Sequence, residues 1–337
     1  MFSLKKALTT AVMVSPLAFV PVQDSGAVDL TGASSTATTE KTEVLMACGK
    51  ADKGNCSKVV PAIASKVSGG VVLEPANTEG SVESAQLVCK GEIDVGGQKV
   101  AVPTAIVQAD AADSVMSTQP GCARTLLVVG QPVYPYTLFA VVRADSSYDD
   151  LWQMVKAHRN EGKKLSVSAG KEGSGGLVTL RNLVNADDGV KQTVDIVSLD
   201  QNIALQQLEN GQLGVFLSMD SPDSDFVEKI RKAMTPDGKQ KFKFVDVDLS
   251  DFGKLDAKRA FNRPLYQETQ FNVPGGWFGR TVNTVTTFAA VVANKDWANG
   301  AGSKATVSLG KGLDDATALV REATKTPREW TPPALAR

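Results

Sequence analysis

A glycine-rich turn between a strand and a helix constrains the fold of this chain more than any other segment. Residues 165–169 form a short apolar run, residues 170–176 read Gly-Lys-Glu-Gly-Ser-Gly-Gly, and apolar residues then recur at helical spacing from Leu177 to Val184. A strand, a glycine turn and a helix start direct unpaired backbone N–H groups towards an anion. Ser174 is the expected N-cap. The pattern fits an anion site, and it fits a structural connection equally well.

Short apolar runs alternate with amphipathic helical patterns along most of the chain. This alternation predicts an α/β fold in which largely parallel sheets are covered by helices. The chain is long enough for two lobes, each with its own core. The alternating run from Val282 to Ala293 is expected to be a long strand that returns to the first lobe. The other expected strands are residues 42–47, 71–74, 93–95, 105–108, 126–129, 138–142, 194–197, 213–218 and 242–247.

The N-terminus has the pattern of an export signal. Two lysines precede the apolar stretch 7–20, and small residues at 25–27 offer a cleavage site. The stretch is too short for a membrane-spanning helix and contains Pro16, which leaves a retained amphipathic anchor as the alternative. We therefore expect residues 1–27 to be a cleaved signal peptide, residues 28–42 to be a disordered leader, and the mature protein to be periplasmic.

Composition and motifs argue against several classes of function. The chain carries 36 Lys and Arg against 37 Asp and Glu, so no basic excess predicts nucleic-acid binding. His158 is the only histidine and no Cys-x-x-Cys pair occurs, so we expect no metal site and no cofactor. The loop 170–176 lacks the Lys-Ser/Thr ending of a nucleotide-binding P-loop, and no Gly-x-Ser-x-Gly nucleophile turn occurs. We therefore expect a binding protein and not an enzyme.

Four cysteines in an exported chain predict disulfide bonds. Three pairings are open, and we favour Cys48–Cys56 with Cys89–Cys122. The first bridge would close the short loop after the first strand. Cys89 lies on the apolar face of its expected helix, so its side chain points inward. Four buried thiols are the alternative.

An ordered set of short motifs carries a family resemblance. The motifs are Asn77-Thr-Glu-Gly-Ser-Val-Glu-Ser84 with Gly91-Glu-Ile-Asp94, Gln108-Ala-Asp110, residues 138–143 and 162–176, and Leu208-Glu-Asn-Gly211. In this order they resemble the TAXI family of TRAP-transporter solute receptors, which are type 2 periplasmic-binding proteins. Two positions depart from the family pattern. The loop 48–56 has no aromatic residue, and Glu79 stands where glycine is usual.

The resemblance implies an α/β fold of two lobes, each a mostly parallel sheet flanked by helices, joined by a two-strand hinge. We expect lobe 1 to comprise residues 43–137 and, on the chain's return, residues 285–337 with the C-terminal tail. Lobe 2 is expected at residues 138–284. The implied function is that of a monomeric receptor that closes on a small anionic solute. The solute would be a dicarboxylate or an amino acid such as glutamate, delivered to membrane transporter subunits.

The expected ligand site lies where strand ends and helix starts of both lobes meet, because open α/β sheets bind ligands at the carboxyl ends of their strands. Helix starts at Ser81 and Ser174 would direct their positive dipole ends at a carboxylate. Weaker candidates are Trp277 with Phe278 as an apolar cover, and one of three arginines as a clamp, Arg143, Arg181 or Arg280. The expected ligand-binding residues are Thr78, Gly80, Ser81, Gln108, Asp110, Tyr136, Gly173, Ser174, Gly175 and Gly176.

Two other functions remain open from the sequence. A phosphate-type oxyanion receptor of an ABC transporter also uses glycine, serine and a helix start, and Gly173-Ser-Gly175 resembles the motif of that family. A stand-alone ligand sensor or scaffold of the same fold would need no transporter. The altered loop 48–56 favours this last possibility.

Overall fold

The computed structural model describes residues 41–49, 54–95, 97–222, 224–252, 254–255, 258–273 and 280–334. The expected signal peptide and nearly all of the expected leader lie outside these residues, as do Trp277 and Phe278. The strands are β1 (Thr42–Ala47), β2 (Val71–Ala76), β3 (Glu92–Val95), β4 (Gln98–Ala101), β5 (Thr104–Gln108), β6 (Leu126–Val129), β7 (Pro135–Arg143), β8 (Leu165–Ser168), β9 (Val194–Ile196), β10 (Val215–Asp220), β11 (Phe242–Val245), β12 (Arg259–Ala260), β13 (Arg263–Pro264), β14 (Gln267–Val273) and β15 (Arg280–Asn294). The helices are α1 (Cys56–Ala64), α2 (Ser81–Lys90), α3 (Ala109–Thr118), α4 (Pro120–Thr125), α5 (Leu151–Asn160), α6 (Gly175–Ala186), α7 (Asp188–Thr193), α8 (Gln201–Glu209), α9 (Asp225–Lys232), α10 (Lys295–Asn299) and α11 (Ser303–Ala323), with a 3₁₀ turn, η1, at Leu249–Phe252.

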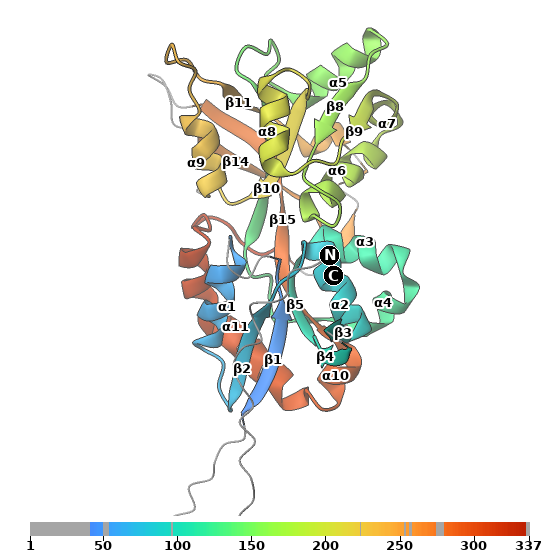
Figure 1. Ribbon diagram of the computed structural model, residues 1–337, viewed down its shortest axis with the longest axis vertical. Coiled ribbons are helices and arrows are strands. Elements are labelled where there is room, and N and C mark those ends of the chain that lie inside the picture. Colours follow the sequence, from blue (N-terminus) through green and yellow to red (C-terminus); the bar gives the residue numbers. More distant parts are fainter. Residues whose placement is uncertain are drawn as a thin grey trace, which may run out of the picture. The chain divides into compact units, whose positions relative to one another are not determined.

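The main sheet runs in the order β2-β1-β5-β15-β7-β10-β8-β9. We refer to the part built on β1, β2, β5 and β6 as lobe 1, and to the part built on β8, β9, β10, β11 and β14 as lobe 2. Strand β15 passes through both, because Ala289–Ala293 pair with β5 while Thr286–Phe288 pair with β7. Strand β7 continues from this pairing into lobe 2 beside β10. Figure 1 shows β15 running lengthwise between the two groups of helices, so the predicted two-lobed α/β fold with a two-strand hinge is confirmed.

Strand direction is more mixed than the sequence predicts. Pairing is parallel in β2-β1-β5 and in β9-β8-β10. Around the hinge, β15 pairs antiparallel with β5, β6, β7 and β14, and β7 pairs antiparallel with β10 and β11. The physical reason is that the hinge strands carry the chain out of one lobe and back into the other. The expected strand 93–95 also differs, because β3 pairs only with β4 in a separate hairpin.

Helices cover both faces of each half of the sheet, which explains the long apolar runs of the central strands. In lobe 1, α1 and α11 pack on one face and α2 and α3 on the other. In lobe 2, α5 and α6 cover one face and α8 and α9 the other. Figure 1 shows these two layers on either side of the strands. From Val285 to Asn294 every residue of β15 is buried.

The C-terminal tail, which the sequence groups with the return to lobe 1, crosses from lobe 1 to lobe 2. It leaves the end of α11 at Thr324, whose carbonyl oxygen accepts a hydrogen bond of 2.8 Å from the Ser221 hydroxyl. Trp330 then packs against the core of lobe 2. Further on, the Arg263 guanidinium donates to the carbonyl oxygen of Pro333 and, at 2.6 Å, to the side chain of Gln131. The tail is thus a further connection between the lobes.

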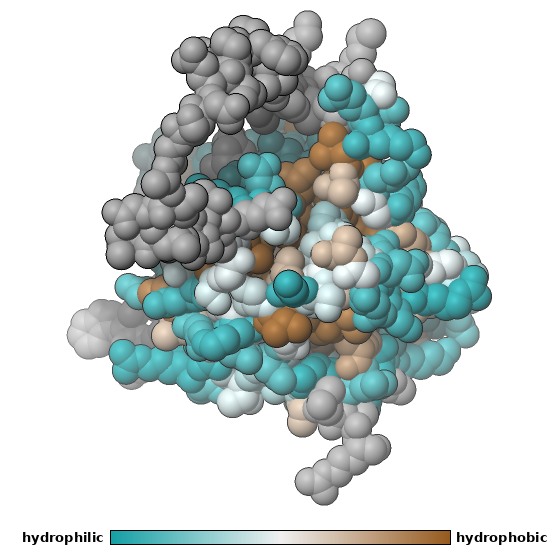
Figure 2. Space-filling model, turned by 90° about the horizontal axis from the view of Figure 1, so that it is seen from below, coloured by the Kyte–Doolittle hydropathy of each residue, from teal (hydrophilic) through white to brown (hydrophobic). Residues whose placement is uncertain are grey.

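Both predicted disulfide bonds are confirmed. Cys48 and Cys56 are bonded with their Cα atoms 5.5 Å apart, and Cys89 and Cys122 with theirs 5.1 Å apart. The second bridge links α2 to α4 and is buried in the lobe 1 core beside Val88. Figure 2 shows hydrophilic residues over most of the face seen from below, with apolar residues in patches between them. None of the helices in the described residues has the length and apolar composition needed to cross a bilayer.

Candidate functional site

The starts of α2 and α6 face each other across the two lobes. Ser174 caps α6, as predicted, since its hydroxyl accepts a hydrogen bond of 3.3 Å from the Leu177 N–H. The Val82 N–H, in the first turn of α2, donates to the carbonyl oxygen of Gly173 at 3.3 Å. The glycine-rich loop of lobe 2 therefore lies directly against the start of a helix in lobe 1.

This approach requires glycine at position 80. A Cβ atom built on Gly80 would lie 2.6 Å from the Gly173 carbonyl oxygen and 3.1 Å from the Cα of Ser174. Gly175 is similarly restricted, because its Cβ would lie 2.5 Å from the side-chain oxygen of Gln108. The glycines at these two positions thus allow the lobes to touch.

A cavity of about 260 Å³ opens beside these helix starts, with walls from both lobes. Seven of the predicted ligand-binding residues line it, namely Gly80, Ser81, Gln108, Tyr136, Ser174, Gly175 and Gly176. The sequence missed its other walls, which are Cys48, Gly49, Ile106, Ala169, Gly170, Gln201, Phe216, Leu217, Ser218 and Met219. A signal was available for part of this wall. Residues 213–218 are expected to form a buried strand, and the carboxyl end of that strand belongs at the same edge of the sheet as the glycine-rich loop.

The remaining three predicted residues, Thr78, Asp110 and Gly173, do not line the cavity, and their part in ligand binding stays a prediction. Thr78 is 7% exposed. Its hydroxyl accepts from the Gly49 N–H at 2.8 Å and lies 2.7 Å from the hydroxyl of Ser84. Thr78 therefore fixes the loop after β1 to the first turns of α2.

Asp110 is fully buried where lobe 1 meets lobe 2. Its carboxylate accepts hydrogen bonds from the hydroxyls of Thr179 at 2.6 Å and Tyr266 at 2.8 Å, both in lobe 2. The Gln108 amide donates to the same carboxylate at 2.6 Å and to the Gly175 carbonyl oxygen at 3.2 Å. Burial raises the pKa of Asp110, and these hydrogen bonds offset part of that rise.

Tyr136 contributes an aromatic wall from the hinge strand β7. Its hydroxyl lies 2.8 Å from that of Tyr134, and the two rings are 5.0 Å apart between centroids. Burial raises the pKa of Tyr136 to about 12, so its hydroxyl is neutral at physiological pH. The cavity therefore has a polar end at the helix starts and an aromatic wall at the hinge.

The charged candidates have partners within the chain. Glu79 of lobe 1 forms an ion pair with Lys171 of lobe 2, which offsets the negative charge of Glu79. Each of the arginines proposed as a clamp is also paired, Arg143 with Asp145, Arg181 with Glu172, and Arg280 with Asp149. None of the three arginines lines the cavity.

A second cavity, of about 220 Å³, adjoins the carboxyl end of β10. Lys58 from α1 and Asp220 from the end of β10 both line it, so the lobes contribute opposite charges. Asp220 directly follows Met219, which lines the first cavity. Burial raises the pKa of Asp220 to about 6, and the hydrogen bond from the Ser221 N–H opposes this rise.

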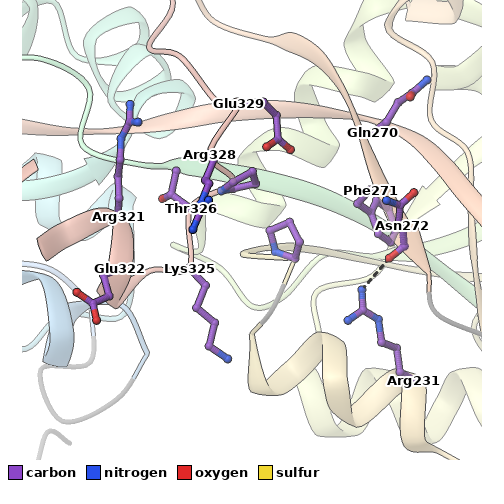
Figure 3. Close-up of a pocket in the computed structure, with 12 residues that line it drawn as sticks. Arg231, Gln270, Phe271, Asn272, Arg321, Glu322, Lys325, Thr326, Arg328 and Glu329 are labelled. Carbon is purple, nitrogen blue, oxygen red and sulfur yellow. Dashed lines mark hydrogen bonds between the residues drawn. The ribbon is translucent and has the colours of Figure 1, made fainter. Parts of the chain in front are cut away.

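A wider groove, of about 700 Å³, lies under the C-terminal tail and shares no residue with the cavity at the helix starts. Figure 3 shows its walls, with Lys325 and Arg328 from the tail on one side and Arg231 of α9 on the other. Arg231 donates to the carbonyl oxygen of Asn272 at 3.2 Å. The groove thus separates the tail from α9 and β14 and is lined by long charged side chains.

One group of carboxylates has the spacing needed to hold a metal ion. The ligand atoms of Asp150, Asp248 and Asp251 lie within 4.8 Å of one another. The sequence pointed to no metal site here, because these residues come from separate segments. Asp150 has a structural role as the N-cap of α5, accepting from the Gln153 N–H at 2.8 Å.

Comparison with known proteins found similar solved structures but no related sequence. No family model matches the chain, and no curated protein matches it in sequence. Three solved structures illustrate the similarity. A probable amino-acid ABC transporter extracellular-binding protein from Bacillus subtilis is 10% identical, with 85% of this chain and 99% of that chain covered and a TM-score of 0.49. A putative L-cystine ABC transporter protein from Listeria monocytogenes is 12% identical, covering 84% and 95%, with a TM-score of 0.48.

The third is an amino-acid ABC transporter substrate-binding protein from Streptococcus pneumoniae, bound to L-arginine. It is 15% identical, covers 84% of this chain and 94% of that chain, and has a TM-score of 0.46. At such identities the similarity concerns the course of the chain and does not extend to the solute.

Proposed function

We propose that this chain is an exported, monomeric receptor that closes two lobes on a small anionic solute and delivers it to membrane transporter subunits. The observation that carries the proposal is the cavity of about 260 Å³ whose walls come from both lobes and include the starts of α2 and α6. In this proposal residues 1–27 are a signal peptide and residues 138–284 form lobe 2. Lobe 1 comprises residues 43–137 and the return of the chain from residue 285, which ends in the C-terminal tail up to residue 337.

The two helix starts supply the attraction for an anion. Each helix N-terminus carries a partial positive charge and backbone N–H groups without intrahelical partners. The hydroxyls of Ser81 and Ser174 add side-chain groups at the same place. The volume of about 260 Å³ is just below the usual range for ligand sites, roughly 300–1,000 Å³, which favours a solute of amino-acid size.

Among small anionic solutes, the charges nearby favour one that carries an ammonium group, such as the amino acid glutamate, over a dicarboxylate that lacks one. Asp220 borders the second cavity, immediately after the residue that lines the first. A carboxylate at this point attracts an ammonium group. Phosphate, the solute of the alternative ABC-type receptor, has no cationic group to place there.

Closure about the hinge is the proposed mechanism. Strands β7 and β15 join the lobes through the pairs Thr286–Thr137 and Phe288–Pro135. A solute that contacts both helix starts binds the closed arrangement more tightly than an open one, and so shifts the population towards closure. The TAXI resemblance favours a TRAP-type transporter as the recipient. A stand-alone sensor of the same fold would close in the same way without one.

Native mass spectrometry of the exported protein, purified without added ligand, tests the proposal. A co-purified amino acid or small carboxylate supports it, and a bound phosphate supports the alternative receptor. A bare protein that also shows no thermal shift with L-glutamate, succinate or inorganic phosphate would leave the sensor or scaffold as the better account.

Capping variants then locate the site. Ser174→Pro removes a hydroxyl and an N–H at the start of α6 and should abolish solute binding, while Ser174→Ala removes the hydroxyl alone. Asp150 caps α5 in the same way, through the Gln153 N–H, and lines neither the 260 Å³ nor the 220 Å³ cavity. Asp150→Ala should therefore cost a similar amount of stability, about 1 kcal/mol, with unchanged affinity. Equal affinity in the Ser174 and Asp150 variants would place the site elsewhere.

A further inference from the structure

A buried carboxylate holds the two lobes together next to the proposed solute site. Asp110, near the start of α3 in lobe 1, has no exposed surface. Both hydroxyls that donate to it from lobe 2, those of Thr179 and Tyr266, contact the same oxygen, Oδ2. Separation of the lobes would remove both donors at once.

These contacts determine where α6 begins relative to lobe 1. Thr179 lies one turn after Gly175, the first residue of α6, and its hydroxyl also contacts the Gly175 carbonyl oxygen at 3.2 Å. The Gln108 amide bridges the same two groups, with Nε2 at 3.2 Å from the Gly175 oxygen and 2.9 Å from the Thr179 hydroxyl. Asp110 therefore anchors the first turn of the helix that lines the cavity.

Few charges face Asp110 in this arrangement. Its own helix contributes Asp113, whose pKa is raised by burial and lowered by the nearby Lys258. The segment 258–266 contributes Lys258, which donates to Asn182, and Tyr266, whose pKa burial raises well above its ordinary value. From the hinge comes Tyr136, and on α6 Arg181 pairs with the exposed Glu172. Arg259 on β12 is exposed, and Asp220 lies beyond Tyr136.

We propose that Asp110 is a positioning residue that holds the start of α6 against lobe 1 and makes lobe closure depend on the protonation of its carboxyl group. The inference deepens the proposed function and rests on it. The proton is taken up on closure, because an open arrangement returns the carboxyl group to water, where it is charged near neutral pH.

The direction of the pH dependence follows from this burial. Since the pKa of Asp110 is raised where the lobes touch, the closed arrangement binds a proton more tightly than the open one. Protonation of Asp110 therefore favours closure at pH values below the ordinary pKa of an aspartate. This contribution is lost as the pH rises through the raised pKa of Asp110. The hydroxyls of Thr179 and Tyr266 can rotate to serve either protonation state.

Small-angle X-ray scattering of the full chain without added solute measures lobe separation directly. The wild type should have a larger radius of gyration at about pH 8 than at about pH 4. Asp110→Asn keeps the shape and the acceptor oxygen, so it should stay compact and lose more than half of this pH-dependent change. Asp110→Ala should be expanded at both pH values. Asp195→Asn changes an exposed carboxylate on β9 that takes no part in the contacts of Asp110, and it should behave as the wild type.

Two further variants act from the opposite lobe, in case Asp110→Ala fails to fold. Tyr266→Phe and Thr179→Val each remove one hydroxyl donor and should shift the ratio of closed to open molecules roughly tenfold towards open. Tyr148→Phe removes a hydroxyl elsewhere in lobe 2 and should shift nothing. A radius of gyration that does not change with pH in the wild type, or that stays compact in Tyr266→Phe and Thr179→Val, would overturn the inference. If the scattering results are as expected but the wild type binds no solute, this would instead count against the proposed function.

Discussion

Replacing Gly80 by alanine should prevent the lobes from closing while leaving each lobe folded. The new Cβ atom would meet the Gly173 carbonyl oxygen at 2.6 Å and the Ser174 Cα at 3.1 Å. Both atoms belong to the backbone of lobe 2, so no side-chain rotation relieves the contact. The φ angle of Gly80, +155°, also lies where residues with a side chain are rarely found.

The magnitude follows from the cost of forcing an extra methyl group into a close contact, which is about 1–3 kcal/mol. Because the clashing atoms lie in different lobes, the molecule avoids this cost by opening. The ratio of closed to open molecules, and with it the solute affinity, should then fall by a factor of roughly 5 to 150. Opening would also break the hydrogen bond of 3.2 Å between Gln108 and Gly175.

Isothermal titration with the solute found by native mass spectrometry, or with L-glutamate as the first probe, measures the affinity. Gly121→Ala is the matched control, because a Cβ on Gly121 in α4 meets nothing within 4 Å. It should leave affinity unchanged and stabilise the fold by up to about 1 kcal/mol. If Gly80→Ala binds solute as tightly as Gly121→Ala does, closure does not bring these backbones together and the reasoning is refuted.

Three further predictions concern stability. Replacing both Cys89 and Cys122 by alanine should cost about 3–4 kcal/mol, since the bridge closes a loop with a sequence separation of 33, and chemical denaturation measures the loss. Asp220→Asn should stabilise the protein by up to about 3 kcal/mol at about pH 8 and by little at about pH 4. The reason is that burial raises the pKa of Asp220 to about 6, so this carboxyl group loses its stabilising contribution as the pH rises through that value. Equal melting shifts at both pH values would contradict this. Trp330→Ala should lower the free energy of unfolding by about 1–3 kcal/mol, because the ring packs on the lobe 2 core and lies 5.8 Å from the Arg321 guanidinium. An unchanged denaturation midpoint would mean that the tail contributes nothing to stability.

Features set by neighbouring residues could be predicted from the sequence. The cap at Ser174 follows from a side chain that reaches an N–H three residues ahead. The long return strand β15 is visible because apolar residues recur along the alternating run from Val282 to Ala293. Cysteine spacing and the expected inward direction of Cys89 were enough to favour the pairing that the structure contains.

Features set by distant segments were not predictable in the same way. The strand at 93–95 is visible in the sequence, but its place in a separate hairpin is not, because a strand pattern does not say which strand it pairs with. The tail around Trp330 has no helix or strand periodicity, and its path is fixed by Arg263 and Ser221, which are far away in the sequence. The wall of the cavity from β10 was missed although the strand itself was expected, because an apolar strand pattern does not say which of its side chains face a cavity.

Gln108 shows how such contacts between distant segments restrict the choice of solute. Its position at a strand end predicted a ligand-binding residue, without saying which end of the amide would face the ligand. In the structure Nε2 donates to Asp110, Gly175 and Thr179, an orientation assigned from this hydrogen-bond network. Because lobe-to-lobe contacts occupy Nε2, the amide can offer a solute only its oxygen, which accepts and does not donate. The side-chain oxygen of Gln108 and the carboxylate of Asp220 both suit an ammonium group. The two helix starts suit a carboxylate. Together these groups favour a solute that carries both charges.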